Sequence, residues 1–345
     1  MIRQAFERQA VACETLGSPF TARLCRLAAE RLEAKGRVEQ EILSWPNDST
    51  GAGDALALRL AGALHALVLS GQDDALASVY PPHEVFDDEL WGAVDAAMKT
   101  HEDLISDRLR SAPQTNEIRR SSALLPGFLM IARLFGKPLH LLEIGASAGL
   151  NLQWDRYHYR LGSVDWGDPA SRVHLQPDWQ GAEPPAAHLE VRDRRGCDLN
   201  PLDPTSADDR LRLMSYVWAD QRDRMERLEA ALSIAASAPS PVERNDALSW
   251  LPRMLSQDRQ GAVTVIYHTI AWQYLPPKDR AKGEAIIAKA GSRATTDAPL
   301  ARLELEADDN AEGAALRLQV WPGGERQEIG RADFHGRWVK WKGWQ

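Results

Sequence analysis

The chain has 345 residues, of which 44% are hydrophobic and 26% are charged, and its formal net charge is −8. This composition suits one large globular domain or two modest ones and excludes a wholly disordered chain. Basic residues alternate with acidic ones and form no cluster, so we expect no nucleic acid as a partner. The three cysteines have neither metal-ligand nor disulfide-framework spacing, and no metal is predicted.

The first residues lack the apolar stretch of a secretory signal, and no apolar run is long enough to span a bilayer. We therefore expect a cytoplasmic protein with no membrane partner.

The first third of the sequence predicts helices. Pro19 follows Ser18 as a helix start, and Leu24, Leu27 and Leu32 then recur on one face before Gly36. A second apolar helix ends before Gly71, and two more are predicted at about 88–110 and 117–135. Residues 1–110 are therefore predicted to form a helical N-terminal region.

From residue 137 onward the pattern changes to alternating strands and helices. This alternation predicts an α/β domain over residues 111–345, with a mostly parallel sheet and an antiparallel hairpin at its C-terminal end. The hairpin is indicated by the turn at 322–324. A second, inserted hairpin is expected at about 157–185. The predicted strands are 139–144, 188–193, 240–245, 262–270, 299–307, 314–321 and 331–339; the predicted helices are 148–157, 207–236, 246–257 and 277–290.

The strongest motif is residues 143–149, EIGASAG, where a strand ends and the chain turns on small residues. Such a turn lets a ligand approach the backbone, although ordinary strand-to-helix connections also use glycine. The dinucleotide fingerprint requires glycine where Ser147 and Leu150 stand, counting from Gly145. A dinucleotide-dependent oxidoreductase is therefore not expected.

The spacing of this motif resembles the first motif of class I S-adenosylmethionine-dependent methyltransferases, with Ser147 in place of the usual central glycine. Residues 195–201, RGCDLNP, resemble the segment whose acid binds the cofactor ribose, a role that falls on Asp198. Residues 242–247, VERNDA, resemble the strand end whose acid, here Asp246, contacts adenine. The competing interpretations are a turn cap for Asp198 and a helix cap for Asp246.

The sequence also resembles, over nearly its whole length, a family of uncharacterised bacterial proteins classed as a domain of unknown function. The resemblance is carried by 145–152 (GASAGLNL), 154–157 (WDRY), 114–117 (QTNE), 196–201 (GCDLNP) and 268–274 (HTIAWQY). It implies the architecture and brings no known reaction.

The candidate substrate-side residues follow the predicted strand 262–270. His268 could act as a general base near neutral pH, with Tyr274 as a second catalytic candidate, and Trp272 could form a wall of the pocket. A structural histidine is the alternative. Asn116 and Glu117 could bind a polar substrate, with capping of the following helix as their alternative role.

Together these patterns predict a Rossmann-like class I methyltransferase fold and an S-adenosylmethionine-dependent methyltransferase of a small-molecule or protein acceptor. A non-catalytic nucleoside-binding scaffold or sensor of the same fold is the alternative. The resemblance assigns the cofactor to Glu143, Gly145, Ala146, Ser147, Gly149, Asp198, Leu199, Asp246 and Ala247.

Overall fold

The computed structural model describes residues 2–46, 55–238, 241–257 and 259–345. The chain divides into two compact units: unit 1 comprises residues 1–115 and 205–229, and unit 2 comprises residues 116–204 and 230–345. The first boundary lies near the predicted residue 110, but residues 205–229 belong with the helical unit and not with the α/β unit. The aromatic ring of Tyr216 packs against Gly62, where a Cβ atom would collide with it, and so joins this segment to the helices.

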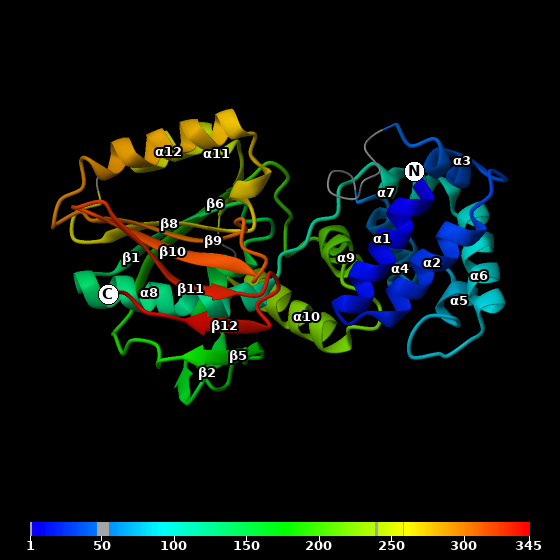
Figure 1. Cartoon of the computed structure of the whole chain (residues 1–345), viewed down its shortest axis with the longest axis horizontal. Helices are drawn as coiled ribbons and strands as arrows, with labels where there is room; N and C mark the ends of the chain where they lie inside the picture. Colours follow the sequence, from blue (N-terminus) through cyan, green and yellow to red (C-terminus); the bar gives the residue numbers. More distant parts are fainter. Residues whose placement is uncertain (1, 47–54, 239–240, 258) are drawn as a thin grey trace. The chain divides into compact units, whose positions relative to one another are not determined.

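Unit 1 is a bundle of helices around an apolar core (Figure 1). Ser18 caps its second helix by accepting a hydrogen bond from the Thr21 amide, and Pro19 stands at the first helical position. The Asp220 carboxylate accepts hydrogen bonds from the Ser18 hydroxyl and the Phe20 amide, which fixes the turn before this helix. The helices are α1 (Ile2–Thr15), α2 (Pro19–Arg31), α3 (Arg37–Leu43), α4 (Leu56–Leu69), α5 (Asp74–Ala77), α6 (Asp87–Thr100), α7 (Glu102–Leu109) and α9 (Ala207–Ser215).

Helix α10 (Arg222–Ser237) runs across the boundary at residue 229 between the units. None of the helices in the described part of the chain has the length and apolar character needed to cross a membrane.

Unit 2 is built on a nine-stranded sheet whose order is β5-β12-β11-β10-β9-β8-β1-β6-β7. The neighbours from β7 to β9 are parallel, whereas β9 to β12 form an antiparallel meander. The strands are β1 (Leu139–Ile144), β5 (Asp178–Gly181), β6 (Val191–Asp198), β7 (Val242–Arg244), β8 (Val263–Thr269), β9 (Leu300–Glu306), β10 (Ala314–Trp321), β11 (Glu325–Ala332) and β12 (Trp338–Trp341).

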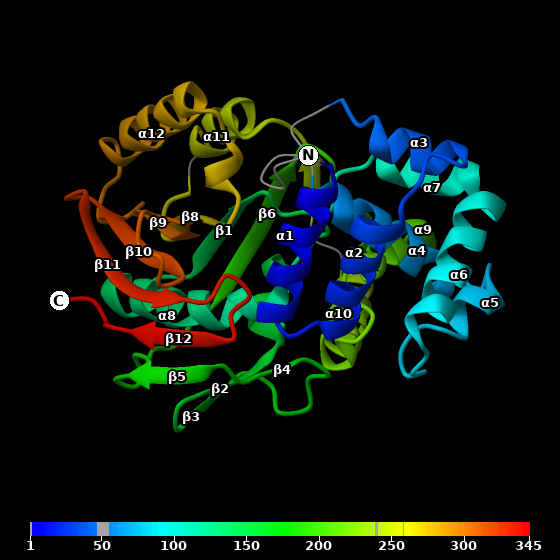
Figure 2. The ribbon, with the colours of Figure 1, turned by 45° about the vertical axis from the view of Figure 1, so that its right-hand side comes forward.

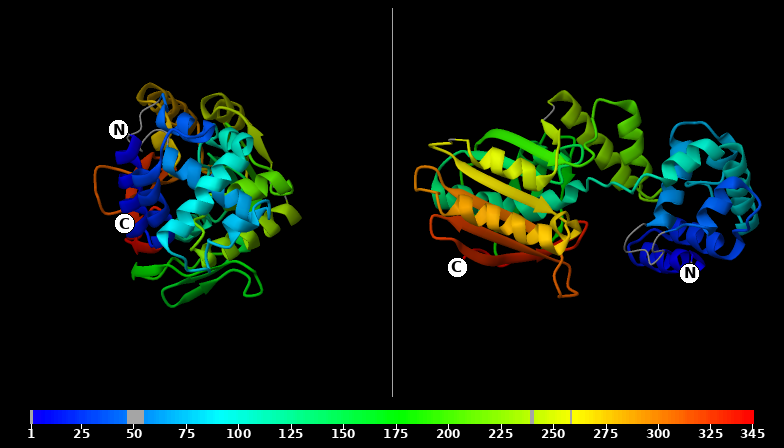
Figure 3. Two further views of the ribbon diagram at one scale, coloured as in Figure 1. Left: turned by 90° about the vertical axis from the view of Figure 1, so that its right-hand side faces the viewer. Right: turned by 90° about the horizontal axis from the view of Figure 1, so that it is seen from above.

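Helices cover both faces of this sheet, which explains why the central strands β1, β8 and β9 are almost entirely buried. Helices α11 (Ala247–Leu255) and α12 (Pro277–Gly291) lie over one face, and α8 (Ser121–Phe135) lies over the other (Figures 1 and 3). On the α8 face, Gly127 lies against Leu303 of β9, so the helix approaches the strand closely. The structure thus has the predicted mixed α/β architecture with a largely parallel sheet.

Within the segment where an inserted hairpin was expected (about 157–185), β2 (His158–Leu161) pairs antiparallel with β3 (Val164–Trp166), and β4 (His174–Leu175) lies beside β2. The last strand of the insertion, β5, is not part of this small sheet. It pairs in parallel with β12 at the edge of the nine-stranded sheet (Figure 2). The pairing of β5 with a strand far along the sequence was not expected.

Several element boundaries differ from the prediction. The helix predicted at 148–157 is the 3-10 helix η2 (Leu150–Arg156), and the Tyr157 and Tyr159 hydroxyls donate to the carbonyls of Leu150 and Trp154 in this segment. The helix predicted at 207–236 is divided into α9 and α10, and the one predicted at 88–110 into α6 and α7.

The prediction of one strand at 331–339 is wrong: β11 occupies residues 325–332 and β12 occupies residues 338–341, with a turn between them. The Asp333 carboxylate accepts hydrogen bonds from the amides of His335 and Arg337, which ends β11 and starts β12. The strands predicted at 139–144, 262–270, 299–307 and 314–321 agree with β1, β8, β9 and β10 within one residue, whereas β6 (191–198) begins and ends later than the strand predicted at 188–193. Of the strand predicted at 240–245, residues 242–244 form β7, and residue 240 lies outside the described residues.

The packing of α8 predicts the effect of removing one aromatic ring. Phe128 is fully buried, stacks on Trp154 with ring centroids 4.3 Å apart and meets Tyr267 edge to face at 5.2 Å. We expect Phe128→Ala to lower the free energy of unfolding by about 3–5 kcal/mol, measured by urea denaturation. Leu134→Ala on the same helix is the control: its side chain is 42% exposed, and a change above about 0.5 kcal/mol is not expected. Equal effects would contradict the described packing.

Candidate functional site

The carboxyl ends of the three central parallel strands lie level with one another. Ile144, the last residue of β1, is paired with Cys197 of β6 on one side and with His268 of β8 on the other. The chain leaves β1 toward β6 and β7 and then returns to β8 on the opposite side of β1. A switch point therefore lies between β1 and β8, which is where open α/β sheets bind their ligands.

The turn after β1 is held mainly by hydrogen bonds to the end of β6. The amides of Gly145 and Ala146 both donate to the Cys197 carbonyl, and the Gly149 amide donates to the Ala146 carbonyl. Gly145 and Gly149 have φ values of 71° and 72°, a region that favours glycine. A Cβ atom on Gly145 would lie 2.8 Å from that of Ala271, so the loops after β1 and β8 are in direct contact.

Asp198, at the end of β6, joins this turn to the neighbouring strand. One carboxylate oxygen accepts the Ser147 amide at 2.9 Å, and the other accepts the Asn200 amide at 2.8 Å. Its side chain is partly exposed, and an ionised carboxylate has about four acceptor positions, so lone pairs remain for a ligand. The structure thus shows the turn cap that was the competing interpretation of Asp198, and the ribose-binding role stays a prediction.

Asn116 and Glu117 lie beside the same turn. The Asn116 side-chain oxygen accepts the Leu150 amide at 3.0 Å, directly after Gly149. Glu117 caps the 3-10 helix η1 (Ile118–Arg120) by accepting the Arg119 amide, and its carbonyl accepts a hydrogen bond from Asn151. Both side chains are buried, so these contacts fix the end of the turn.

Two residues beside the switch point have an unfavourable backbone conformation. Ser147 has φ 52° and Ile270 has φ 49°, and among the described residues Ala55 is the only other non-glycine residue with positive φ. For a β-branched residue such as Ile270 this conformation costs about 1–3 kcal/mol, and such strain is concentrated at functional sites. The strained residues stand after β1 and after β8, one on each side of the switch point.

A buried carboxylate holds the loop after β8. Oε1 of Glu306, the last residue of β9, accepts the amides of Ala271 and Trp272 at 3.0 Å each and lies 2.7 Å from Nδ1 of His268. Burial alone would raise the pKa of Glu306, but the hydrogen bonds from His268 and from the two amides outweigh it, so the pKa lies below its usual value. The carboxylate therefore fixes the loop that contacts Gly145.

His268 is enclosed within this network. Its exposed fraction is 0%, Nδ1 donates to Glu306, and Nε2 accepts a hydrogen bond from Arg302 at 3.2 Å. Since a guanidinium can only donate, Nε2 must be the unprotonated nitrogen. Both ring nitrogens are thus engaged within the protein, which agrees with the alternative of a structural histidine; the catalytic role stays a prediction.

Trp272 and Tyr274 lie in different environments. Trp272 stacks on His268 with ring centroids 5.0 Å apart. The guanidinium of Arg302, on β9, lies 4.8 Å from the centroid of the Trp272 ring, so the indole belongs to the core under α12. Tyr274 ends the 3-10 helix η3 (Trp272–Tyr274) and is 74% exposed. Only Tyr274 of this pair presents its ring to solvent.

The remaining predicted cofactor residues lie at the same edge with unequal exposure. Glu143 is buried and accepts a hydrogen bond from the Tyr267 hydroxyl at 3.3 Å, and burial holds the pKa of Glu143 well above its usual range. Asp246 caps α11 by accepting the amides of Leu248 and Ser249, and Ala247 is buried behind it. Leu199, next to Asp198, is 64% exposed.

Sequence reasoning missed Arg302 and Glu306. The signal was present in strand 300–306, LARLELE, where charged residues alternate with apolar ones. In a half-exposed strand this pattern indicates a solvated face, but both faces of β9 are covered, and Arg302, Glu304 and Glu306 are therefore buried together. Only the position of the strand within the sheet distinguishes the two cases.

The sequence profile of one bacterial family matches residues 3–341, and its description is "Uncharacterized protein conserved in bacteria (DUF2332)". None of the curated proteins matches the chain. The family resemblance expected from the motifs at 145–152 and 268–274 is confirmed over nearly the whole chain, and the description names no reaction.

The contact between the two loops predicts the effect of a methyl group at Gly145. We expect Gly145→Ala to lose about 1–2 kcal/mol from its left-handed backbone and about 1–3 kcal/mol more from the collision with Ala271. Gly136→Ala is the matched control, because Gly136 has φ 61° and no neighbour within 4 Å of an added Cβ. Urea denaturation measures both, and a loss for Gly145→Ala no larger than for the control would exclude the close contact.

The role of Glu306 predicts a pH-dependent loss of stability. We expect Glu306→Gln to cost about 2–3 kcal/mol at neutral pH, because the hydrogen bonds from His268 and the loop amides lose their charged acceptor. The folded-state pKa lies below the unfolded value of about 4.3, so this stabilisation is complete above that value and disappears as the pH falls through the folded pKa. The difference from wild type should therefore shrink as the pH falls from about 7 to below 4.

Urea denaturation at several pH values measures this difference. Glu284→Gln is the control, since Glu284 pairs with Arg302 at 2.6 Å but is 47% exposed, and should cost less than about 1 kcal/mol. A difference for Glu306→Gln that stays constant with pH would argue against an ionised anchor.

Proposed function

The chain belongs to this family of uncharacterised bacterial proteins, and from the geometry of its switch point we propose that it is an S-adenosylmethionine-dependent methyltransferase with a class I methyltransferase fold. The observation that carries the proposal is the arrangement of Asp198 beside the 145–149 turn. The partly exposed Asp198 carboxylate, at the end of β6, accepts a hydrogen bond from the turn after β1. That turn borders the switch point in the strand order between β1 and β8.

The hydrogen bonds of the turn support a ligand without phosphate. A dinucleotide or nucleotide phosphate needs free amides at such a turn. Here the amides of Gly145, Ala146, Ser147, Gly149 and Leu150 all have acceptors within the protein. S-adenosylmethionine carries a ribose, an adenine and an amino-acid group, and its ribose needs the acceptors that Asp198 offers.

The residues present fit this cofactor in part. Asp198 would accept hydrogen bonds from the ribose hydroxyls, and the exposed side chains of Leu199 and Tyr274 would cover apolar surfaces of the nucleoside. Asp246, partly committed to capping α11, would accept from the adenine amino group with its remaining lone pairs. Glu143 is buried beneath the turn and would act through the shape of the turn and not by direct contact.

S-adenosylmethionine would supply a methyl group on a positively charged sulfur, which an acceptor nucleophile displaces. The contribution of the protein would be to hold the acceptor in line with that methyl group. Glu306 would fix the loop at 270–273 as one wall of the site. With His268 enclosed, Tyr274 is the exposed candidate among the two predicted catalytic residues.

The acceptor is proposed to be a small molecule or another protein. The net charge of −8 opposes binding of a polyanion such as a nucleic acid. We place the reaction in the cytoplasm.

A non-catalytic nucleoside-binding scaffold is the second candidate function. The observation that favours it is the enclosure of His268, whose two nitrogens are both engaged by protein groups. Such a protein would keep the ribose-binding carboxylate without a base at the acceptor position.

Calorimetric titration tests the binding step. We expect saturable binding of S-adenosylmethionine or S-adenosylhomocysteine and none of NAD. Asp198→Ala should weaken that binding by about 10- to 100-fold, the loss typical of a hydrogen bond to a charged group. Asp198→Asn keeps an acceptor for the Ser147 amide and serves as a second variant if the alanine variant is unstable.

Glu190→Ala is the matched control for the loss of one negative charge. Glu190 is exposed and precedes β6 at the amino end of the parallel strands, opposite to the proposed site. No binding at millimolar ligand to the folded protein would overturn both candidate functions. Binding together with transfer of the methyl group to a small-molecule or protein acceptor would separate the enzyme from the scaffold.

A further inference from the structure

The small sheet of the insertion, formed by β2, β3 and β4 (Figure 2), has one buried face and one face open to solvent. Tyr159, Leu161 and Leu175 lie on the buried face. His158 and His174 alternate with these residues along β2 and β4 and therefore lie on the other face. His174 is exposed, and the side chain of His158 is 17% exposed, so both imidazoles are accessible from solvent.

The two histidines are direct neighbours across β2 and β4. They are paired in the parallel register, and the His158 amide donates to the Val173 carbonyl at 2.9 Å. Their ring centroids are 4.9 Å apart, with an angle of 54° between the ring planes. Two imidazoles that bind one zinc ion, each through a nitrogen at about 2.1 Å and with about 90–110° between the two bonds, have their centroids about 4.6–5.3 Å apart. The backbone thus already holds the rings at the separation that a shared metal ion requires.

A carboxylate lies beside this histidine pair. Oδ1 of Asp165, on β3, is 3.9 Å from Nε2 of His158. Arg160 fixes the Asp165 carboxylate through two hydrogen bonds, of 3.0 and 2.8 Å. Each imidazole has two nitrogens, and histidines that bind a metal commonly donate the second N–H to a carboxylate. Asp165 is placed for that role toward His158.

The histidine pair has no third metal ligand from the protein. In the part of the chain that the structure describes, no group of three or more His, Cys, Asp or Glu side chains is arranged to hold a metal ion. The two imidazoles are therefore the protein ligands available at this position, and water would occupy the remaining coordination positions of a bound ion.

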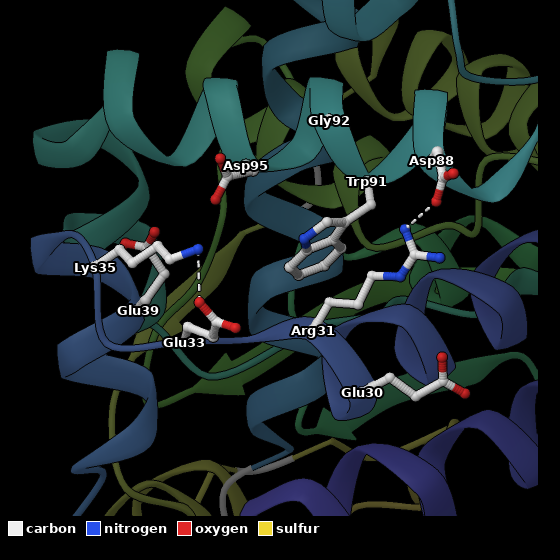
Figure 4. A pocket seen from close by; sticks show the side chains of 9 residues that line it. All are labelled: Glu30, Arg31, Glu33, Lys35, Glu39, Asp88, Trp91, Gly92 and Asp95. Atoms are coloured by element: carbon white, nitrogen blue, oxygen red, sulfur yellow. Dashed lines mark hydrogen bonds and ion pairs between the residues drawn. The ribbon is translucent and has the colours of Figure 1, made fainter.

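The cavity of unit 1 is a different environment. It lies among α2, α3 and α6, has a volume of about 450 Å³ and is lined by carboxylates, two of which pair with Arg31 and Lys35 (Figure 4). None of the described residues that line it is a histidine or a cysteine, and the Glu39 carboxylate is closed off, with an exposed fraction of 1%. Zinc is bound in proteins mainly by nitrogen and sulfur, so the histidine pair suits it and this cavity does not.

We infer that His158 and His174 bind one Zn²⁺ ion between β2 and β4. The ion links two strands that share only two residue pairs, and it stabilises the small sheet because it binds the folded arrangement of the rings. Neither histidine belongs to the proposed cofactor site, so the inference does not depend on the proposed function.

Titration calorimetry of the full chain with ZnCl₂, after removal of any affinity tag, tests this inference. We expect saturable binding of one ion per chain. MgCl₂ should give no binding, because Mg²⁺ favours oxygen ligands. His158→Gln and His174→Gln should each reduce the affinity for Zn²⁺ by at least about tenfold, since each leaves a single imidazole. His174 is exposed, so His174→Gln carries the test if His158→Gln does not fold.

His83→Gln is the matched control, because His83 is an exposed histidine of unit 1, and it should leave the affinity unchanged. Zn²⁺ should also raise the free energy of unfolding of the wild-type chain in urea more than that of His174→Gln. Absence of saturable Zn²⁺ binding by the folded wild-type chain would overturn the inference. Binding that persists unchanged in His174→Gln would show an adventitious ion only and would overturn it as well.

Discussion

The parallel pairing of β1 with β6 on one side and β8 on the other is the constraint on which the site depends. Because Ile144 is level with both Cys197 and His268, the first residues after all three strands must leave the sheet at one edge. Residues more than 120 positions apart, Gly145 and Ala271, are thereby brought into contact. Without this register the Asp198 carboxylate would not reach the Ser147 amide.

A network of buried charged side chains also fixes the loops at that edge of the sheet. On the α12 side of β9, Arg302 pairs with Glu304 at 3.0 Å and hydrogen-bonds to His268, while Glu306 holds both His268 and the loop after β8. Burial alone would raise the pKa of Glu304, but attraction to the Arg302 and Arg326 guanidinium groups outweighs it, so the pKa lies below its usual value. Such a network is stable only when every member has its partners, so it favours one conformation of the loop over all others.

The local part of this structure could be predicted from the sequence, and the long-range part could not. The turn at 145–149 and the acid at 198 were predicted because each depends on a few adjacent residues. The buried position of His268 and the role of Glu306 depend on β8 and β9 being covered on both faces, which strand 300–306 does not reveal by itself. The break between α9 and α10 and the grouping of residues 205–229 with the helical unit depend likewise on contacts such as that of Tyr216 with Gly62.

The pairing of β5 with β12 has a consequence for how the chain is made. Residues 178–181 find their place in the large sheet only beside residues 338–341, which leave the ribosome more than 150 residues later. Until then the tryptophan-bearing segment at 178–181 and the open side of the growing sheet have no strand to cover them, and exposed strand edges are sites of mispairing between chains. Closure of the sheet is therefore a late event of synthesis, and contacts over such separations form slowly.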